Sequence, residues 1–203
     1  MKIICVGRNY KAHASELGNA IPEQPVIFLK PDTALIQKGQ AFYIPHFSKE
    51  IHFETELVVK INRLGKNISE KYAHKYYSEI SLGIDLTARD IQSELKGKGL
   101  PWERAKAFDH SAPLGKFISL DSIDQANDIH FKLLINKEER QRGKSSDMLF
   151  SIDQLIENIS KFITLKIGDL IFTGTPEGVG PIHIGDHLEG YIEDKKVLDL
   201  KVK

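Results

Sequence analysis

The sequence predicts a single domain of mixed α and β structure in which strands outnumber helices. At 203 residues the chain is long enough for one substantial core and does not require a second domain. Apolar and polar residues alternate along several short stretches, which is the pattern of a half-buried strand. Fewer stretches carry the spacing and capping residues of a helix. We therefore expect an α+β protein that is mostly β, with one domain over residues 1–203.

Charge and composition exclude several classes of partner. Lysine plus arginine and aspartate plus glutamate both number 28, so the chain has no net charge. The basic residues are scattered, which argues against binding to nucleic acid or to an anionic membrane. No apolar run approaches the ~18 residues of a membrane span, and the first run is too short for a signal peptide. We expect a cytoplasmic protein in which the single cysteine, Cys5, is a buried structural thiol.

The N-terminal region is expected to form a strand followed by a helix. Residues 2–6 are an apolar run, and a turn leads from them into a helix over residues 11–17. His13 and Glu16 lie three apart on that helix, so the carboxylate can hold the imidazole in one tautomer. The alternative is an ordinary surface pair worth a few tenths of a kcal/mol.

The next two elements carry less chemistry. Residues 25–31 predict a buried strand that ends in Lys30, with prolines on both sides to stop further regular structure. Residues 69–77 predict a short surface helix that begins with Ser69 as its cap. We assign no catalytic role to that helix.

Between them lies a strand with two neighbouring carboxylates. Residues 51–61 alternate almost strictly, which places Glu54 and Glu56 on the same face. At a rise of roughly 3.3 Å per residue their carboxylates come close enough to share one cation. Without a cation or water they repel each other, so either a metal ion or a solvated edge face explains the pattern. A third oxygen ligand elsewhere would favour the metal.

Asp85 is the candidate for that third ligand. It stands near the end of a predicted strand over residues 79–86, where a rigid strand fixes a side chain and the following loop gives access. Residues 87–90 resemble a capping box. The helix that they begin carries Arg89 and Gln92 on one face.

A loop and a lysine follow this helix. Residues 96–102 are rich in glycine and proline and are long enough to form a lid. Lys106 then lies among small and aromatic residues rather than other charges. A partly buried lysine requires a negative partner, and a metal-bound carboxylate substrate would supply one.

The second half of the chain is expected to be mainly structural. Residues 129–136 and 140–144 predict a hairpin, and Ser151 begins an amphipathic helix with a capping box. Residues 167–180 predict a strand that breaks into a glycine-rich loop without the lysine of a phosphate loop. Its backbone N–H groups can still face a substrate carboxylate. Residues 184–203 predict two final strands.

Six stretches together resemble motifs of the fumarylacetoacetate hydrolase family, most closely its short branch of acylpyruvases and oxaloacetate decarboxylases. They follow the family's order: Gly7-Arg8-Asn9-Tyr10 with His13, Phe28-Leu29-Lys30-Pro31, His52-Phe53-Glu54-Thr55-Glu56-Leu57, Asp85-Leu86-Thr87-Ala88-Arg89-Asp90, Gly99-Leu100-Pro101-Trp102 with Lys106, and Thr173-Gly174-Thr175-Pro176-Glu177-Gly178-Val179-Gly180. The resemblance implies a mixed β roll or sandwich with peripheral helices, a homodimer, and a Mg²⁺ or Mn²⁺ ion bound by carboxylates.

The resemblance also implies roles for particular residues. The metal ligands correspond to Glu54, Glu56 and Asp85, an all-oxygen set that suits a hard cation. His13 and Glu16 correspond to a catalytic dyad that activates water. The residues expected to contact substrate are Lys106, which faces its negative oxygens, and Arg8, Lys30, Gln92 and Thr175.

The expected function is hydrolysis or lysis of a carbon–carbon bond in a small 2-oxo acid, through a metal-stabilised pyruvate enolate. The substrate would be an acylpyruvate, oxaloacetate, or both. One alternative within the resemblance is isomerisation or decarboxylation of an unsaturated dioate in aromatic catabolism. The alternative from another class is a β-rich ligand-binding protein without enzymatic activity.

Overall fold

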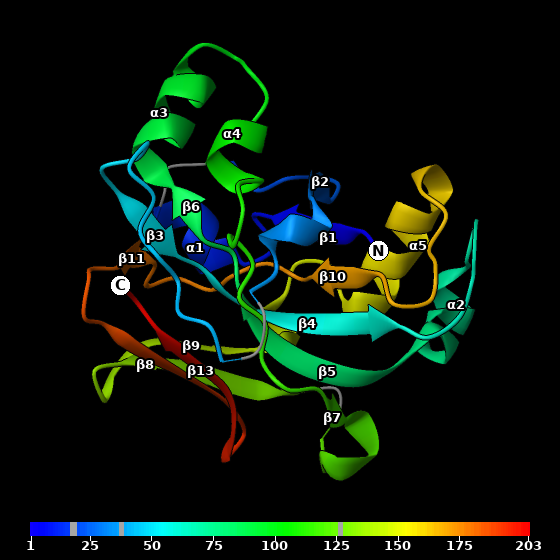
Figure 1. Ribbon diagram of the computed structural model, residues 1–203. Coiled ribbons are helices and arrows are strands. Elements are labelled where there is room, and N and C mark those ends of the chain that lie inside the picture. The colour runs from blue at the N-terminus through cyan, green and yellow to red at the C-terminus, as the bar shows by residue number, and fades with distance from the viewer. Residues whose placement is uncertain (17–19, 37–38, 126–127) are drawn as a thin grey trace.

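The computed structural model describes residues 1–16, 20–36, 39–125 and 128–203, and these form three sheets with helices at their edges (Figure 1). The strands are β1 (Ile3–Gly7), β2 (Val26–Lys30), β3 (Ile51–Phe53), β4 (Thr55–Ile61), β5 (Tyr77–Ile84), β6 (Thr87–Ala88), β7 (Ile118–Ser119), β8 (His130–Ile135), β9 (Glu138–Lys144), β10 (Leu170–Phe172), β11 (Gly180–Pro181), β12 (His187–Ile192) and β13 (Lys195–Lys201). The helices are α1 (Lys11–Glu16), α2 (Glu70–Ala73), α3 (Arg89–Gly97), α4 (Glu103–Lys106) and α5 (Ile152–Phe162).

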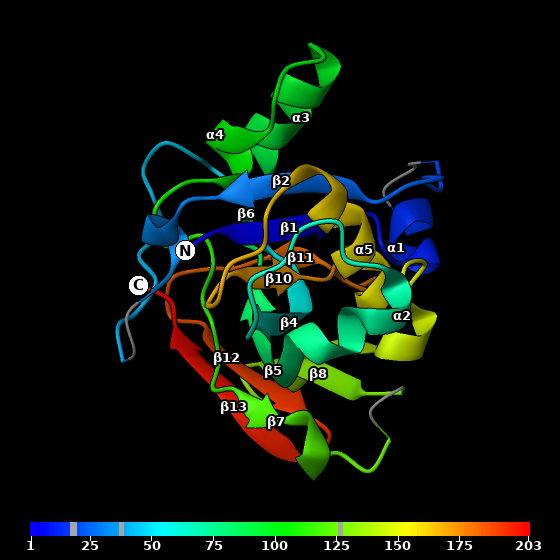
Figure 2. The same ribbon diagram turned by 90° about the vertical axis from the view of Figure 1, so that its right-hand side faces the viewer.

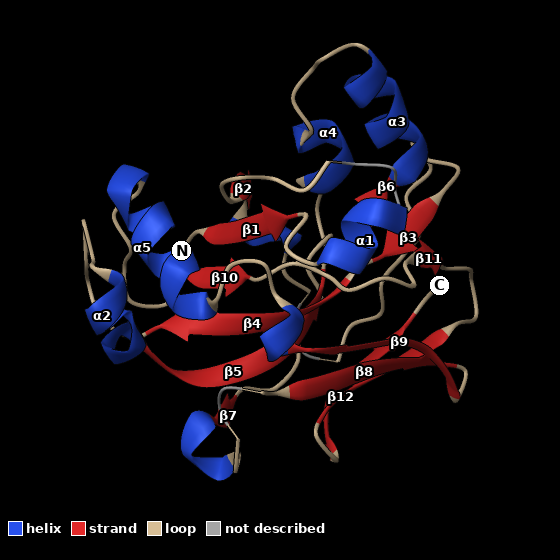
Figure 3. Cartoon of the chain, turned by 180° about the vertical axis from the view of Figure 1, so that it is seen from behind, coloured by secondary structure: helices blue, strands red, loops and turns tan. Residues whose placement is uncertain are grey.

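The sheets confirm the predicted mostly β, α+β fold. The largest has the order β2-β1-β10-β4-β5-β7, in which β1 and β10 are parallel and the other neighbours are antiparallel. The four-stranded sheet β13-β12-β8-β9 lies beneath it in Figure 2, and β11-β3-β6 form a small third sheet. Helices α3 and α4 stand at one end, while α2 and α5 lie together at another side (Figure 3).

Local sequence signals explain several of these elements. Ser151 and Gln154 form the predicted capping box of α5, because Ser151 Oγ accepts from the Gln154 backbone at 3.3 Å and Gln154 Oε1 accepts from the Ser151 backbone at 3.0 Å. The apolar face of α5 is buried in the largest core cluster. The predicted hairpin forms as β8 with β9, and the two predicted final strands are β12 and β13, which pair with each other.

The continuous strand predicted over residues 51–61 is wrong. The chain leaves one sheet at Glu54, so β3 pairs with β6 and β11 whereas β4 pairs with β5 and β10. The alternation of apolar and polar residues did not predict the burial of β4, because this strand is covered on both faces and six of its seven residues are buried. The break places Glu54 between two sheets rather than on a solvated edge.

Three further predictions differ from the structure. Thr87 does not cap α3, which begins at Arg89, because its hydroxyl donates to Glu54 Oε1 at 3.1 Å instead. Strand β2 is not buried as a whole: Leu29 is 42% exposed and only Lys30 is fully enclosed. The helix predicted over residues 69–77 is the short α2 followed by a single 3-10 turn and β5.

Two other expectations concern the helix predicted over residues 11–17 and the absence of a membrane span. Helix α1 is described through Glu16, and the predicted final residue of that helix, Leu17, lies outside the described residues. In the described ranges, no helix has the length and apolar character needed to cross a bilayer.

A buried aspartate ties β10 to the N-terminus. Asp169 Oδ1 accepts from the Lys2 backbone N–H at 2.8 Å, and Oδ2 accepts from the Lys166 backbone N–H at 2.7 Å. The Lys2 ammonium lies 2.5 Å from the same carboxylate. Burial raises the pKa of Asp169, but these hydrogen bonds and the Lys2 charge outweigh it and hold the pKa below its usual value. The carboxylate therefore stabilises the start of the strand that leads to the glycine-rich loop.

We expect Asp169→Asn to lower the free energy of unfolding by about 2 kcal/mol at neutral pH, because an amide cannot accept both backbone N–H groups as an anion does. Because the pKa of Asp169 is lower in the folded state, its ionised form stabilises the fold. This stabilisation is complete above the unfolded-state pKa of about 3.9 and is lost as the pH falls through the folded-state pKa. In urea denaturation, the difference in free energy of unfolding between the wild type and Asp169→Asn should therefore be constant from pH 7 to pH 5 and shrink below about pH 4. The exposed Asp121→Asn is the control, and a difference that persists undiminished in acid would contradict this account.

Candidate active site

Glu54, Glu56 and Asp85 converge because β4 and β5 are antiparallel neighbours. Glu56 pairs with Gly83 in the ladder, and Asp85, just beyond β5, donates its backbone N–H to the Glu54 carbonyl at 2.8 Å. One carboxylate oxygen from each residue lies within 4.8 Å of the other two. All three side chains are buried, with exposures of 7%, 1% and 1%. The alternative of a solvated acidic face is therefore wrong.

Three cations from distant segments surround these carboxylates. Lys106 Nζ donates to Glu54 Oε2 at 2.8 Å and to Asp85 Oδ2 at 2.6 Å, so this lysine has the negative partners that its apolar setting predicted. Arg89 donates to Glu54 Oε1 at 2.6 Å. The ammonium of Lys30 lies 2.7 Å from Asp85 Oδ1.

The cations do not neutralise the three acids equally. Burial raises the pKa of Glu54, but Lys106 and Arg89 outweigh it and hold that pKa far below its usual value. Burial and the charge of Asp85 raise the pKa of Glu56 well above its usual value, and the hydrogen bond from the Gly174 backbone at 2.8 Å offsets this rise only in part. Glu56 forms no ion pair with any of the described side chains.

These observations fit a divalent cation. Asp85 Oδ1 lies close to Lys30 Nζ, yet the direction of approach does not make a hydrogen bond, and no other described group donates to it. A bound cation would satisfy this oxygen and supply the positive charge that Glu56 lacks. Three carboxylates offer the oxygen ligands that Mg²⁺ and Mn²⁺ prefer.

Gly174 must be glycine for Glu56 to be held in this way. Its φ of 99° lies in the left-handed region, and an added Cβ would come within 2.6 Å of the Asn9 Cβ. Asn9 itself donates to the Thr173 carbonyl at 2.7 Å and to the Phe150 carbonyl at 3.0 Å. The glycine-rich loop is therefore fastened against the turn that precedes α1.

The His13 and Glu16 pair forms on α1 as predicted. His13 Nδ1 lies 3.2 Å from Glu16 Oε2, and the Gly178 backbone N–H donates to Glu16 Oε1 at 3.1 Å. His13 is only 5% exposed, which argues against an ordinary surface pair. A proton on Nδ1 that is donated to Glu16 leaves Nε2 as a free base.

A small cavity of about 30 Å³ brings His13, one acid and several cations together. Its walls come from Gly7, Arg8, His13, Phe28, Glu54, Arg89, Gln92, Lys96, Trp102 and Lys106. Three of the five expected substrate contacts, Lys106, Arg8 and Gln92, line this cavity. The other two do not: Lys30 binds Asp85 and Ser111, and Thr175 Oγ1 accepts from Gln141 Nε2 at 2.9 Å.

Sequence reasoning missed four residues of this region. They are Thr87, Lys96, Trp102 and Gln141. Gln141 Oε1 accepts from the Thr55 backbone at 3.0 Å, so a side chain from β9 fixes the backbone between the two glutamates. The polar side chain in a hairpin strand was the available signal, but its partner lies 86 residues away in the sequence. Arg89 was noted only as a neighbour of Gln92, to which it donates at 2.5 Å.

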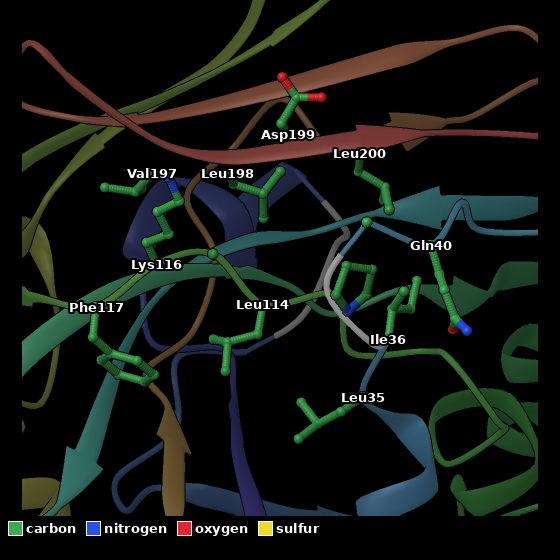
Figure 4. A pocket seen from close by; sticks show the side chains of 13 residues that line it. Leu35, Ile36, Gln40, Leu114, Lys116, Phe117, Val197, Leu198, Asp199 and Leu200 are labelled. Atoms are coloured by element: carbon green, nitrogen blue, oxygen red, sulfur yellow. The ribbon is translucent and has the colours of Figure 1, made fainter.

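A much larger and mostly apolar cavity lies elsewhere. It measures about 660 Å³, and Figure 4 shows Leu198 and Leu200 pointing from β13 toward Leu114 and Ile36 while Asp199 points away. No histidine dyad or cluster of acids lines it among the described residues. We do not consider it the active site.

A second cluster of possible metal ligands lies on the four-stranded sheet. It consists of His187, Glu189 and Asp199. Lys196 already lies 2.5 Å from both carboxylates and offsets part of their charge. This more exposed group therefore serves as a control for the buried one.

The chain resembles known proteins over nearly its whole length. The profile of the family described as "Fumarylacetoacetate (FAA) hydrolase C-terminal" matches residues 2–203. The chain is 43% identical over 201 residues to the mouse protein "Oxaloacetate tautomerase FAHD1, mitochondrial", covering 99% of this chain and 91% of the mouse protein. It is 44% identical over 188 residues to "Oxaloacetate tautomerase YcgM" of Escherichia coli strain K12, covering 92% of this chain and 86% of that protein.

One similar protein of known structure was solved with ligands bound. Fumarylpyruvate hydrolase from Pseudomonas aeruginosa, in complex with Mn²⁺ and pyruvate, superposes with a TM-score of 0.93 at 34% sequence identity. The match covers 100% of this chain and 89% of that one.

We expect Glu56→Gln to weaken Mn²⁺ binding by at least about tenfold, because the amide keeps the hydrogen bond from Gly174 but removes an anionic ligand. Isothermal titration of the chelator-treated protein measures this directly. Asp85→Asn should behave in the same way, whereas Glu189→Gln in the exposed cluster should leave the strongest site unchanged. Equal affinity in the wild type and both buried-site variants would favour a protein without this metal site.

Proposed function

The chain belongs to the fumarylacetoacetate hydrolase family, and on this premise we propose that it is a divalent-metal-dependent enzyme acting on small 2-oxo acids through their enol forms. The observation that carries the proposal is the common cavity onto which His13, Glu54 and Lys106 open. A base, a member of the acidic cluster and a cation thus face one space. The non-enzymatic alternative does not account for that convergence.

The acidic cluster would supply the binding end of the site. A Mg²⁺ or Mn²⁺ ion held by Glu54, Glu56 and Asp85 would polarise the carboxylate and neighbouring oxo group of a 2-oxo acid. Lys106 carries its charge to the same place and would stabilise the negative oxygen that develops as the enol forms. Arg89 and Lys30 hold the carboxylates in position through their contacts with Glu54 and Asp85.

His13 would move the proton. With its Nδ1–H donated to Glu16, its Nε2 can take a proton from carbon 3 of oxaloacetate and deliver it to the oxygen on carbon 2, which converts the keto form into the enol. The reverse transfer regenerates the keto form. With an acylpyruvate, the same nitrogen would take a proton from water as the water attacks the distal carbonyl. The bond between that carbonyl and carbon 3 then breaks, and its electron pair stays with the pyruvate fragment as an enolate. His13 would return its proton to carbon 3, so the products are a carboxylic acid and pyruvate.

Two reactions are therefore the leading candidates. Oxaloacetate tautomerisation is favoured by the names of relatives that align over nearly the whole chain. Acylpyruvate hydrolysis is supported by the likeness to a fumarylpyruvate hydrolase structure. Decarboxylation of oxaloacetate and isomerisation of unsaturated dioates use a related enol and are the remaining alternatives. Homodimeric assembly, a single domain and a cytoplasmic location stay predictions.

Turnover by chelator-stripped protein tests the proposal. We expect Mg²⁺ or Mn²⁺ to restore loss of the ultraviolet absorbance of enol-oxaloacetate, release of pyruvate from acetylpyruvate, or both. The ratio of the two rates assigns the principal reaction. Absence of both activities in folded, metal-loaded protein would remove these two candidates, and unsaturated dioates would be tested next.

His13→Ala should separate hydrolysis from decarboxylation. We expect acetylpyruvate hydrolysis to fall by about 10²- to 10⁴-fold, because only hydrolysis requires an activated water. Oxaloacetate decarboxylation should retain a larger fraction of its rate, as measured by pyruvate formation. The exposed His74→Ala is the matched control. Complete and equal loss of both reactions would indicate that His13 has another role, such as ordering the site.

A further inference from the structure

Arg8 and Lys96 differ from the other cations that surround the site. Arg89, Lys106 and Lys30 each contact a carboxylate of the acidic cluster. Arg8 and Lys96 line the same small cavity, yet neither forms an ion pair with any carboxylate in the part of the chain that the structure describes. Both are only partly exposed. Two half-buried cations therefore face the cavity without a counter-ion.

A single indole ring positions both charges. Arg8 Cζ lies 6.0 Å and Lys96 Nζ lies 5.4 Å from the ring centroid of Trp102. The ring is held in turn by an edge contact with Phe28, at 6.1 Å between centroids. A cation over an aromatic face is attracted to it but keeps its full charge and its N–H donors. Trp102 thus orients Arg8 and Lys96 without neutralising them.

The backbone of Arg8 supports a role for its side chain. Its φ of 60° lies in the left-handed region, which glycine adopts more readily than a residue with a Cβ. Unfavourable backbone conformations at a cavity are kept where the side chain has a function. The fold at this turn would be satisfied by glycine, so the arginine itself requires an explanation.

The charges along the cavity wall point to an anionic ligand. Four cations line it, namely Arg8, Arg89, Lys96 and Lys106, against one carboxylate, Glu54. Burial lowers the pKa of Lys96, and the neighbouring charges of Arg89 and Arg8 lower it further. A ligand carboxylate beside Lys96 would relieve this repulsion.

We propose that Arg8, Lys96 and Trp102 form a subsite for the second carboxylate of a dicarboxylic 2-oxo acid. The inference rests on the proposed function, in which the first carboxylate and the oxo group bind beside Glu54, Glu56 and Asp85. The cavity of about 30 Å³ is smaller than such a ligand, so side chains at its wall move apart on binding. Lys96 and Trp102 are partly exposed members of that wall, contributed by α3 and the residue before α4.

The single tryptophan makes the test direct. Trp102 is the sole tryptophan in the sequence, so intrinsic fluorescence reports on this subsite independently of turnover. The probes are 2-oxoglutarate and 2-oxovalerate, which have the same chain length and differ by a carboxylate in place of a methyl group. In the presence of Mg²⁺ we expect the wild type to bind 2-oxoglutarate about 10- to 100-fold more tightly.

Two variants should abolish this preference. Lys96→Met should weaken 2-oxoglutarate binding by about tenfold or more and change 2-oxovalerate binding by less than about threefold, while Lys96→Arg restores the preference. Arg8→Gly should also lose the preference without lowering the melting temperature, because glycine fits the observed φ. Lys98→Met is the matched control, since the Lys98 ammonium instead binds Glu94 on the surface at 2.6 Å.

The outcomes distinguish this inference from the proposed function. Equal binding of both probes by the wild type, or equal loss of both in Lys96→Met, would overturn the subsite and leave the proposed function intact. Failure of the wild type to bind or turn over any 2-oxo acid would overturn both. The same variants should lower kcat/KM for fumarylpyruvate more than for acetylpyruvate, which lacks the second carboxylate.

Discussion

The structure depends on burying three carboxylates at one point between two sheets. Charges taken out of water are costly unless opposite charges and hydrogen bonds replace the lost solvent. Glu54, Glu56 and Asp85 are brought together by β4 and β5, and the cations that compensate them arrive from other elements. Lys30 ends β2, Arg89 begins α3 and Lys106 ends α4. The positions of β2, α3 and α4 around the main sheet are thus coupled to the electrostatics of one site.

The cations compensate the three buried carboxylates only in part, and the remainder indicates what the site can bind. Glu54 is well satisfied by Lys106 and Arg89, while Glu56 has a neutral backbone donor and Asp85 keeps one oxygen without a hydrogen bond. If these buried carboxylates had no binding role, apolar side chains of similar volume in their place would often make the fold as stable or more stable. The residual negative charge instead suits a divalent cation, and Arg8 and Lys96 in the cavity wall suit an anionic ligand.

The failures of sequence reasoning have a common origin in tertiary structure. Alternation over residues 51–61 predicted one half-buried strand, but the chain changes sheets at Glu54 and is then covered on both faces. Thr87 looked like a helix cap, but a buried carboxylate competes for its hydroxyl. In both places, contacts with residues distant in the sequence outweigh the structure that the local sequence favours. Boundaries far from the site, such as the capped start of α5, follow the local signals closely.

The sequence by itself determined the mostly β character, one hairpin, the two final strands, the capped helix, the family, and the residues that form the acidic cluster and the dyad. Those features depend on spacing within a few residues or on motifs that stay contiguous in the chain. Only the tertiary structure decided which cations neutralise which acids, that Gln141 fixes the backbone beside Thr55, and that Arg8 and Lys96 share the ring of Trp102. Contacts between residues so far apart in the chain leave no periodic trace in the sequence, because they depend on how whole elements pack and where charge must be balanced.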